Sequence, residues 1–260
     1  MPSAFVQKVT GNGATVVLNG VGAGNALFLQ DSWFRTSTTG VAEATPTDSN
    51  GTFHISNANA PIFISSAAVE AGVGIFDQQG AASGTHTVTP QANSGHNTTL
   101  CEFSGLVTSS MFDTGTSAKS VVNNHTSQAT GTTPTTAQSD ELVLICCAIV
   151  AHTGSSNVGW TDPVTTFTTR QIVINSATDI ATHHSSKNVA AVSTQTATEL
   201  WIATEGGIGS MACIATFKAS GTTASAALSM IFPSSLAGTG GNRFFGDRLS
   251  YQILTNLVLG

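Results

Sequence analysis

The chain has 260 residues, of which only 8% are charged, against about 25% in an ordinary soluble domain. Its formal net charge is −6, and Lys and Arg are scattered singly, without the clusters that a nucleic-acid-binding surface needs. No stretch reaches the roughly 18 apolar residues of a membrane span. Thr and Ser, beside 26 Gly, take the place of the charges, so polarity comes from hydroxyls and amides, a composition typical of extracellular or virion β-proteins rather than of cytosolic enzymes.

Short segments in which apolar and polar residues alternate predict β-strands along most of the chain. They lie at 4–10, 14–21, 25–34, 53–56, 62–69, 74–77, 85–90, 98–103, 120–123, 141–150, 166–175, 179–184, 189–194, 200–204 and 211–218. Turn signals such as Gly11-Asn12-Gly13 separate them, and no long segment has a helical period. The pattern predicts an all-β protein, a single antiparallel β-sandwich of jelly-roll type with a two-sheet core.

Two polar stretches interrupt this pattern. Residues 126–139 are rich in Thr, Ser and Gln and form either a long surface loop or an extended edge. The composition changes again after Ala219, which divides the chain into a sandwich body, 1–219, and a C-terminal extension, 220–260. The extension contains apolar segments, so we expect an arm that packs either on its own sandwich or on a neighbouring subunit.

The four cysteines are expected to be reduced and buried. Cys146 and Cys147 are adjacent in an apolar run and would point to opposite faces of a strand, while Cys101 and Cys213 also lie in predicted strands. No C-x-x-C spacing indicates a zinc or redox centre. We therefore expect no cofactor.

Several short sequence motifs at the ends of predicted strands resemble those of a known group of domains. They are Gly24-Asn25 before Ala26-Leu27-Phe28-Leu29, Asp48-Ser49-Asn50-Gly51-Thr52-Phe53, Cys101-Glu102-Phe103-Ser104-Gly105-Leu106 followed by Asp113, Asp140-Glu141-Leu142-Val143-Leu144, and Ala215-Thr216-Phe217-Lys218. Together they resemble a group of bacterial and phage β-sandwich domains of jelly-roll or lectin-like type. Members occur in secreted surface proteins and virion structural proteins, so the resemblance implies a fold more than an activity.

Metal-binding patterns are weak. His183 and His184 would face opposite sides of a strand, and a zinc site would need distant ligands such as His125 or His152. Asp48-Ser49-Asn50-Gly51 begins like a calcium loop, but the twelfth position is Asn59 rather than Glu, so a turn stabilised by Asp48 is favoured.

No catalytic residues are predicted. Glycoside hydrolysis needs two carboxylates beside the scissile bond, and Glu102, Glu141, Glu199 and Glu205 show no close-spaced motif. No Gly-x-Ser-x-Gly nucleophile motif is present, and the glycines at 206–209 precede no predicted helix.

Trp160 is the one candidate for glycan contact. It lies in a polar stretch, 154–163, where its ring could be presented for sugar stacking. Trp33 and Trp201 lie in predicted strands and are expected in the core.

The favoured function is a non-enzymatic bacteriophage virion component, a capsid decoration or a tail or fibre subunit, docked by many weak contacts. Its partners would be other virion proteins and copies of itself. No signal peptide is visible at the N-terminus, so either a signal was removed or the protein leaves its cell without one, as phage structural proteins do when lysis releases them. The alternative is a secreted or surface carbohydrate-binding module, whose partners would be glycans.

Overall fold

The computed structural model describes residues 2–13, 15–35, 44–56, 62–65, 70–90, 95–121, 126–150, 160–161, 166–175, 180–201 and 209–221. All regular elements in these residues are β-strands, and every strand pair is antiparallel. The prediction of an all-β sandwich architecture is thus confirmed. In this part of the chain there is no helix with the length and hydrophobicity that a bilayer crossing requires.

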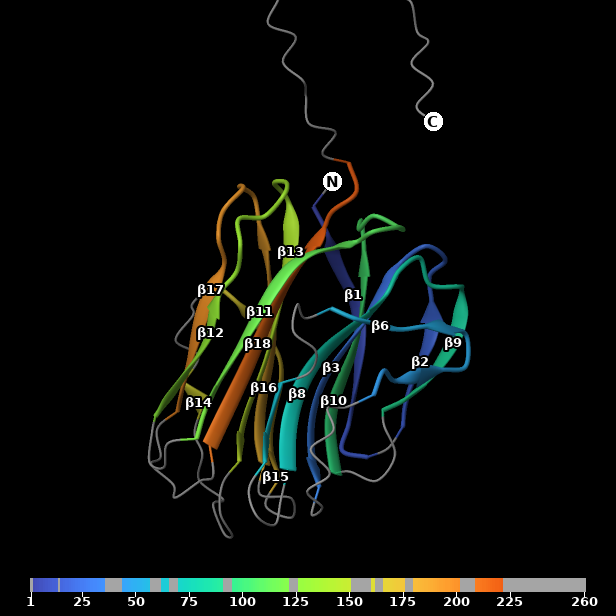
Figure 1. Ribbon diagram of the computed structural model, residues 1–260. Helices are drawn as coiled ribbons and strands as arrows, with labels where there is room; N and C mark the ends of the chain where they lie inside the picture. The colour runs from blue at the N-terminus through green and yellow to red at the C-terminus, as the bar shows by residue number, and fades with distance from the viewer. Residues whose placement is uncertain are drawn as a thin grey trace, which may run out of the picture. The chain divides into compact units, whose positions relative to one another are not determined.

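Two large sheets form the centre of the body (Figure 1). The first has the order β1 (Ala4–Gly11), β10 (Gly95–Ser104), β3 (Ala26–Arg35) and β8 (Glu70–Gln78), and β6 (His54–Ile55) and β7 (Ile62–Ser65) both pair with β8. The second has the order β11 (Phe112–Ser120), β18 (Gly209–Lys218), β13 (Glu141–Val150), β16 (Ile180–Val189) and β15 (Thr168–Asn175).

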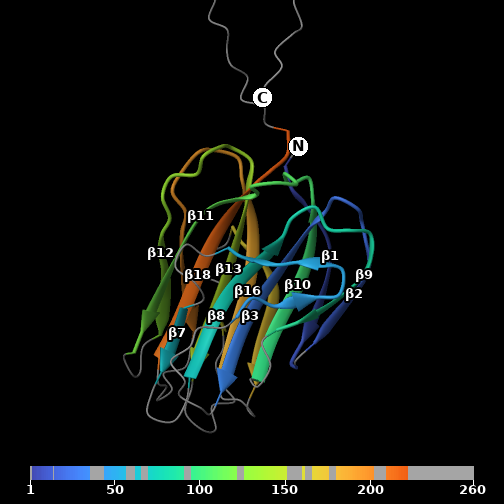
Figure 2. The same cartoon turned by 45° about the vertical axis from the view of Figure 1, so that its right-hand side comes forward.

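A smaller sheet covers the outer face of each central sheet (Figure 2). Over the first lie β2 (Val16–Val21), β9 (Gly84–Thr89), β4 (Thr47–Asp48) and β5 (Gly51–Thr52). Over the second lie β12 (Ser127–Thr132), β17 (Thr196–Trp201) and β14 (Trp160–Thr161). The body therefore contains four stacked layers rather than the two-sheet core that alternation suggested.

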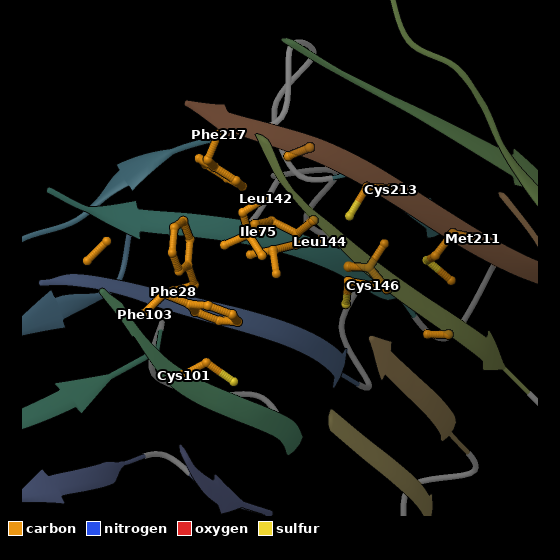
Figure 3. Packing of buried hydrophobic residues seen from close by; sticks show 14 of the residues in the cluster. Phe28, Ile75, Cys101, Phe103, Leu142, Leu144, Cys146, Met211, Cys213 and Phe217 are labelled. Atoms are coloured by element: carbon orange, nitrogen blue, oxygen red, sulfur yellow. The ribbon is translucent and has the colours of Figure 1, made fainter. Parts of the chain in front are cut away.

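The main hydrophobic core lies between the two central sheets (Figure 3). The ring of Phe28 lies 5.7 Å from that of Phe103 in its own sheet and 4.5 Å from that of Phe217 in the other. Two further cores lie beneath the outer sheets. Because the central strands are covered on both faces, β8 and β13 are buried along their whole lengths, which explains the unbroken apolar run of β13.

The two halves of the chain repeat one strand order. The central sheet of the first half reads β1-β10-β3-β8, and that of the second reads β11-β18-β13-β16. Phe5 is paired with Phe103, and Phe112 with Phe217, and in both pairs the register shifts directly after the first Phe. Both pairs pack edge to face, at 5.6 and 6.1 Å. The described body therefore consists of two similarly threaded sandwiches joined through their inner sheets.

Some predicted strands are misplaced. The segment 189–194 is not a strand of its own, since the chain turns after Val189. Of the strand predicted at 120–123, Ser120 is the last residue of β11, and residues 122–123 lie outside the described residues. Within the polar stretch 126–139, residues Ser127–Thr132 form β12, which pairs with β17 as an edge strand. Apart from residues 220–221, the predicted C-terminal extension 220–260 lies outside the described residues.

Candidate functional site

The Glu102 side chain holds a turn in place. It is fully buried on β10 and accepts hydrogen bonds from Gly22 N at 2.8 Å, Asn25 Nδ2 at 2.5 Å and Gln7 Nε2 at 2.6 Å. Three donors occupy the carboxylate, which ties the loop before β3 to the centre of the sheet. This residue has a structural role.

Glu141 and Glu199 are buried on other strands. Burial raises the pKa of Glu141, at the start of β13, to about 7; the Asp113 carboxylate adds to the rise and the Thr216 hydroxyl partly offsets it. Glu199, on β17, is bonded to His183. The structure brings neither of them together with Glu102, and Glu205 lies outside the described residues.

The two adjacent histidines face opposite sides of β16, as predicted. His184 lies between the central sheets, with Nδ1 2.8 Å from Thr99 Oγ1 and Nε2 3.2 Å from Ser32 Oγ. Thr99 also bonds to the Gln171 amide. Both ring nitrogens of His184 therefore have hydroxyl partners inside the contact between the two halves.

His183 faces the outer sheet and lies between an acid and a hydroxyl. Its Nδ1 is 2.6 Å from Glu199 Oε2, and its Nε2 is 3.1 Å from Thr169 Oγ1. The order carboxylate, imidazole, hydroxyl is also that of acyl-transfer triads. His183 and Glu199 are almost fully buried, whereas Thr169 is exposed on the edge strand β15.

No metal centre is formed by the residues that the structure describes, since nowhere do three or more His, Cys, Asp or Glu side chains converge. Asp48 and Gly51 pair across the β4–β5 hairpin, and Asp48 Oδ2 lies 2.6 Å from His86 Nδ1. The carboxylate expected to start a calcium loop is thus bonded to a histidine. His125, His152 and Asn59 lie outside the described residues.

The four cysteines are free and buried, as predicted. Cys146 and Cys213 are opposite each other on β13 and β18. Burial raises the pKa of Cys101 to about 12 and raises those of Cys146 and Cys147 well above their usual range. Thiols of this kind act as small apolar side chains rather than as nucleophiles.

The tryptophans divide into one core residue and two whose side chains lie outside the described part. Trp33 is buried over Gly72, where an added Cβ would come within 2.4 Å of the ring, so the core placement predicted for it is confirmed. The backbone of Trp160, expected in a polar loop, belongs to β14 and pairs with that of Trp201 on β17. Its proposed contact with glycans remains a prediction.

An open groove of about 650 Å³ lies between two edge strands that sequence analysis did not connect. One wall is β1 with the turn after it, and the other is β15. The lining residues are Lys8, Thr10, Asn12, Thr169, Arg170, Gln171, Ile172 and Val173. We call this feature the edge groove.

Arg170 is held in a defined orientation at the edge groove. The register between β15 and β16 shifts between Thr169 and Gln171, so Arg170 is the extra residue of a β-bulge. Its guanidinium carbon lies 4.0 Å from the ring centre of Phe5 and 5.5 Å from that of Phe103. Nε donates to Ser186 Oγ at 2.7 Å, so the guanidinium lies among Phe5, Phe103 and Ser186, which line a separate small cavity of about 100 Å³.

The edge groove is positively charged. Lys8 Nζ donates to the Arg170 carbonyl, and no ion pair joins Lys8 or Arg170 to a carboxylate within the described part of the chain. Burial lowers the pKa of Arg170. Because 162 residues separate the two cations, nothing in the sequence indicated that they meet.

Comparisons with protein-family models, with curated proteins and with solved structures find no match to this chain.

Proposed function

We propose that the protein is a structural component of a bacteriophage virion, built from two jelly-roll sandwiches and docked by repeated contacts. The strand order carries the proposal. With β6 and β7 set aside, the described part of the first half has eight strands, ordered 1-8-3-6 in the central sheet and 2-7-4-5 in the outer sheet. We interpret this order as that of a jelly roll, a fold common in viral capsid proteins and lectins.

The second half supports the same interpretation. Numbered from β11, its central sheet contains strands 1-8-3-6 with strand 5 beyond, and its outer sheet contains strands 2-7-4. Two sandwiches of one type in a single chain suit an assembly in which symmetry repeats each contact many times. Few charges also suit it, since contacts between uncharged hydroxyl and amide groups depend little on salt.

The experiment is quantitative mass spectrometry of particles purified on a density gradient from the phage that encodes the chain. We expect the chain to sediment with the particles at a fixed ratio to the major capsid protein, and to remain after a high-salt wash. A soluble host protein of similar abundance is the control. If the chain is removed from the particles together with the control protein, the proposal is overturned.

The protein is proposed to be non-enzymatic, and the Glu199–His183–Thr169 array allows a direct test. We expect no hydrolysis of p-nitrophenyl acetate by the wild type above the buffer rate. Thr169→Val should lower the free energy of unfolding by about 1 kcal/mol, the value of one hydrogen bond. Turnover that Thr169→Val abolishes would contradict this proposal.

The second candidate function is glycan binding. The observation that favours it is the edge groove, whose hydroxyl, amide and cationic side chains border an open space of ligand size.

A further inference from the structure

Two side chains of the second half meet one buried hydroxyl of the first half. The Thr99 Oγ1 atom, on β10, is hydrogen-bonded to the side-chain carbonyl oxygen of Gln171, on β15. The same Oγ1 atom lies 2.8 Å from Nδ1 of His184, on β16. Thr99 and His184 are fully buried, and Gln171 is almost so. A hydroxyl, an imidazole and a carboxamide are the nucleophile, the base and the electrophile of an acyl transfer.

A β-bulge turns Gln171 toward this hydroxyl. Residues two apart on a regular strand share one face, so Thr169 and Gln171 would ordinarily point the same way. The register between β15 and β16 shifts between them, which places Gln171 directly opposite His184. Thr169 therefore contacts His183 on the outer face, whereas Gln171 contacts Thr99 between the central sheets. The bulge thus aims the carboxamide across the contact between the two halves.

We propose that Thr99 and Gln171 join in an intramolecular ester that links the two halves covalently. Thr99 Oγ1 attacks the side-chain carbonyl carbon of Gln171, Cδ, while His184 Nδ1 takes the hydroxyl proton. The bond between Oγ1 and Cδ forms, and the bond between Cδ and Nε2 of Gln171 breaks. The proton passes from Nδ1 to the leaving nitrogen, which departs as ammonia, so no further reactant is needed. The reaction occurs once in each chain and acts on no external substrate.

The contacts of His184 suit a general base. Its Nε2 lies 3.2 Å from Ser32 Oγ. When Ser32 accepts the Nε2 proton, Nδ1 is the acceptor for the proton of Thr99, and Oγ1 presents its lone pairs to the carboxamide. The distance of 2.8 Å between Nδ1 and Oγ1 is within the reach of direct proton transfer.

The position of Gln171 at the edge groove suits the release of ammonia. Gln171 lines this open groove, so the product leaves toward solvent, whereas the ester stays beside the fully buried Thr99 and away from water. Lys8 lines the same groove and bonds to the carbonyl of the residue before Gln171. Its positive charge favours the negative charge that develops on the carboxamide oxygen.

Proximity compensates for the low reactivity of a carboxamide. The folded core holds the hydroxyl against the carboxamide, and well-oriented intramolecular pairs react as if one partner were present at about 10⁵ M or more. Ammonia is lost into dilute solution, which draws the exchange of amide for ester forward. The reaction therefore follows folding, because only the folded chain brings Thr99 and Gln171 together.

The experiment is intact-mass spectrometry of the purified full chain, followed by digestion with trypsin. We expect a mass about 17 Da below that of the sequence, the mass of one ammonia. Trypsin cleaves after Lys and Arg, so Thr99 falls in the fragment 36–119 and Gln171 in the fragment 171–187. These two fragments should remain joined, and mild alkaline hydroxylamine, which cleaves esters, should separate them.

Three variants test the three roles, and circular dichroism confirms that each folds. Thr99→Val and Gln171→Leu should each abolish the loss of mass, whereas Thr99→Ser, which keeps a hydroxyl, should retain it. His184→Gln should slow the loss at least about a hundredfold, because a positioned general base contributes about 10²–10⁴ in rate. Thr98→Val is the matched control, since Thr98 is the adjacent and equally buried residue of β10 and donates to the Gly11 carbonyl instead. This control should keep the full loss of mass.

Three results would each overturn the inference. The first is a folded wild type with the full sequence mass, which would leave a buried hydrogen bond only. The second is a loss of ammonia that persists in Thr99→Val, as a succinimide at an Asn-Gly pair would give. The third is a loss of mass that Thr98→Val abolishes as well. None of these results bears on whether the chain sediments with particles.

Discussion

Glu141→Gln should remove a pH dependence of stability that the buried Glu141 carboxyl creates. Burial raises its pKa from 4.5 to about 7 in the folded protein. Between these values the unfolded chain releases the proton and the folded protein keeps it, so stability falls as the pH rises through this window. Below pH 4.5 the folded state loses nothing, and above pH 7 the loss is complete. Each pKa unit corresponds to about 1.4 kcal/mol, which gives about 3 kcal/mol in all.

The assay is urea unfolding of the wild type and of Glu141→Gln at pH 5, 6, 7 and 8. We expect the wild type to lose about 2–3 kcal/mol relative to the variant between pH 5 and 8, since Gln mimics the protonated acid. Asp113→Asn removes the neighbouring carboxylate that adds to the rise, so its pH dependence should be shallower. Parallel curves for the wild type and Glu141→Gln would refute the reasoning.

Three further predictions concern the core and its polar contacts. Phe28→Ala should cost about 3–5 kcal/mol and leave one cooperative urea transition, because Phe28 contacts Phe217 of the other half; two separated transitions would show independent halves. Glu102→Gln should lower the free energy of unfolding by about 2–3 kcal/mol in the same assay, because an amide nitrogen would face donors such as Gly22 N. An unchanged urea midpoint would exclude the role of Glu102 in holding the turn before β3. Cys101 and the other thiols should react with Ellman's reagent only after unfolding, and rapid labelling of the native protein would contradict their burial.

Strands with strong apolar patterns could be predicted from the sequence. The segment 141–150 is β13 to the residue, and 211–218 differs from β18 only at its start. In contrast, β11 reads Phe-Asp-Thr-Gly-Thr-Ser-Ala-Lys-Ser and has no alternation, because it is a half-exposed edge that exists through pairing with β18. Such a strand depends on its neighbour rather than on its own residues.

The candidate site could not be predicted from the sequence, for a different reason. His183 and His184 gave a correct local prediction, since the faces of a strand follow from alternation alone. The burial of these two histidines could not be predicted, because β16 is polar in composition and is covered only through the stacking of distant sheets. The meeting of Lys8 with Arg170 likewise depends on how two halves of the chain pack, which no local pattern records.

The core shared by the two halves has a consequence for a shortened chain. A fragment ending after β10 would expose Phe28, Cys101 and Phe103 to water and could cover them only by associating with a second copy or another apolar surface. For such a fragment, folding and dimerisation would be one concentration-dependent event. Joining both sandwiches in one polypeptide makes their association intramolecular, so dilution does not separate them.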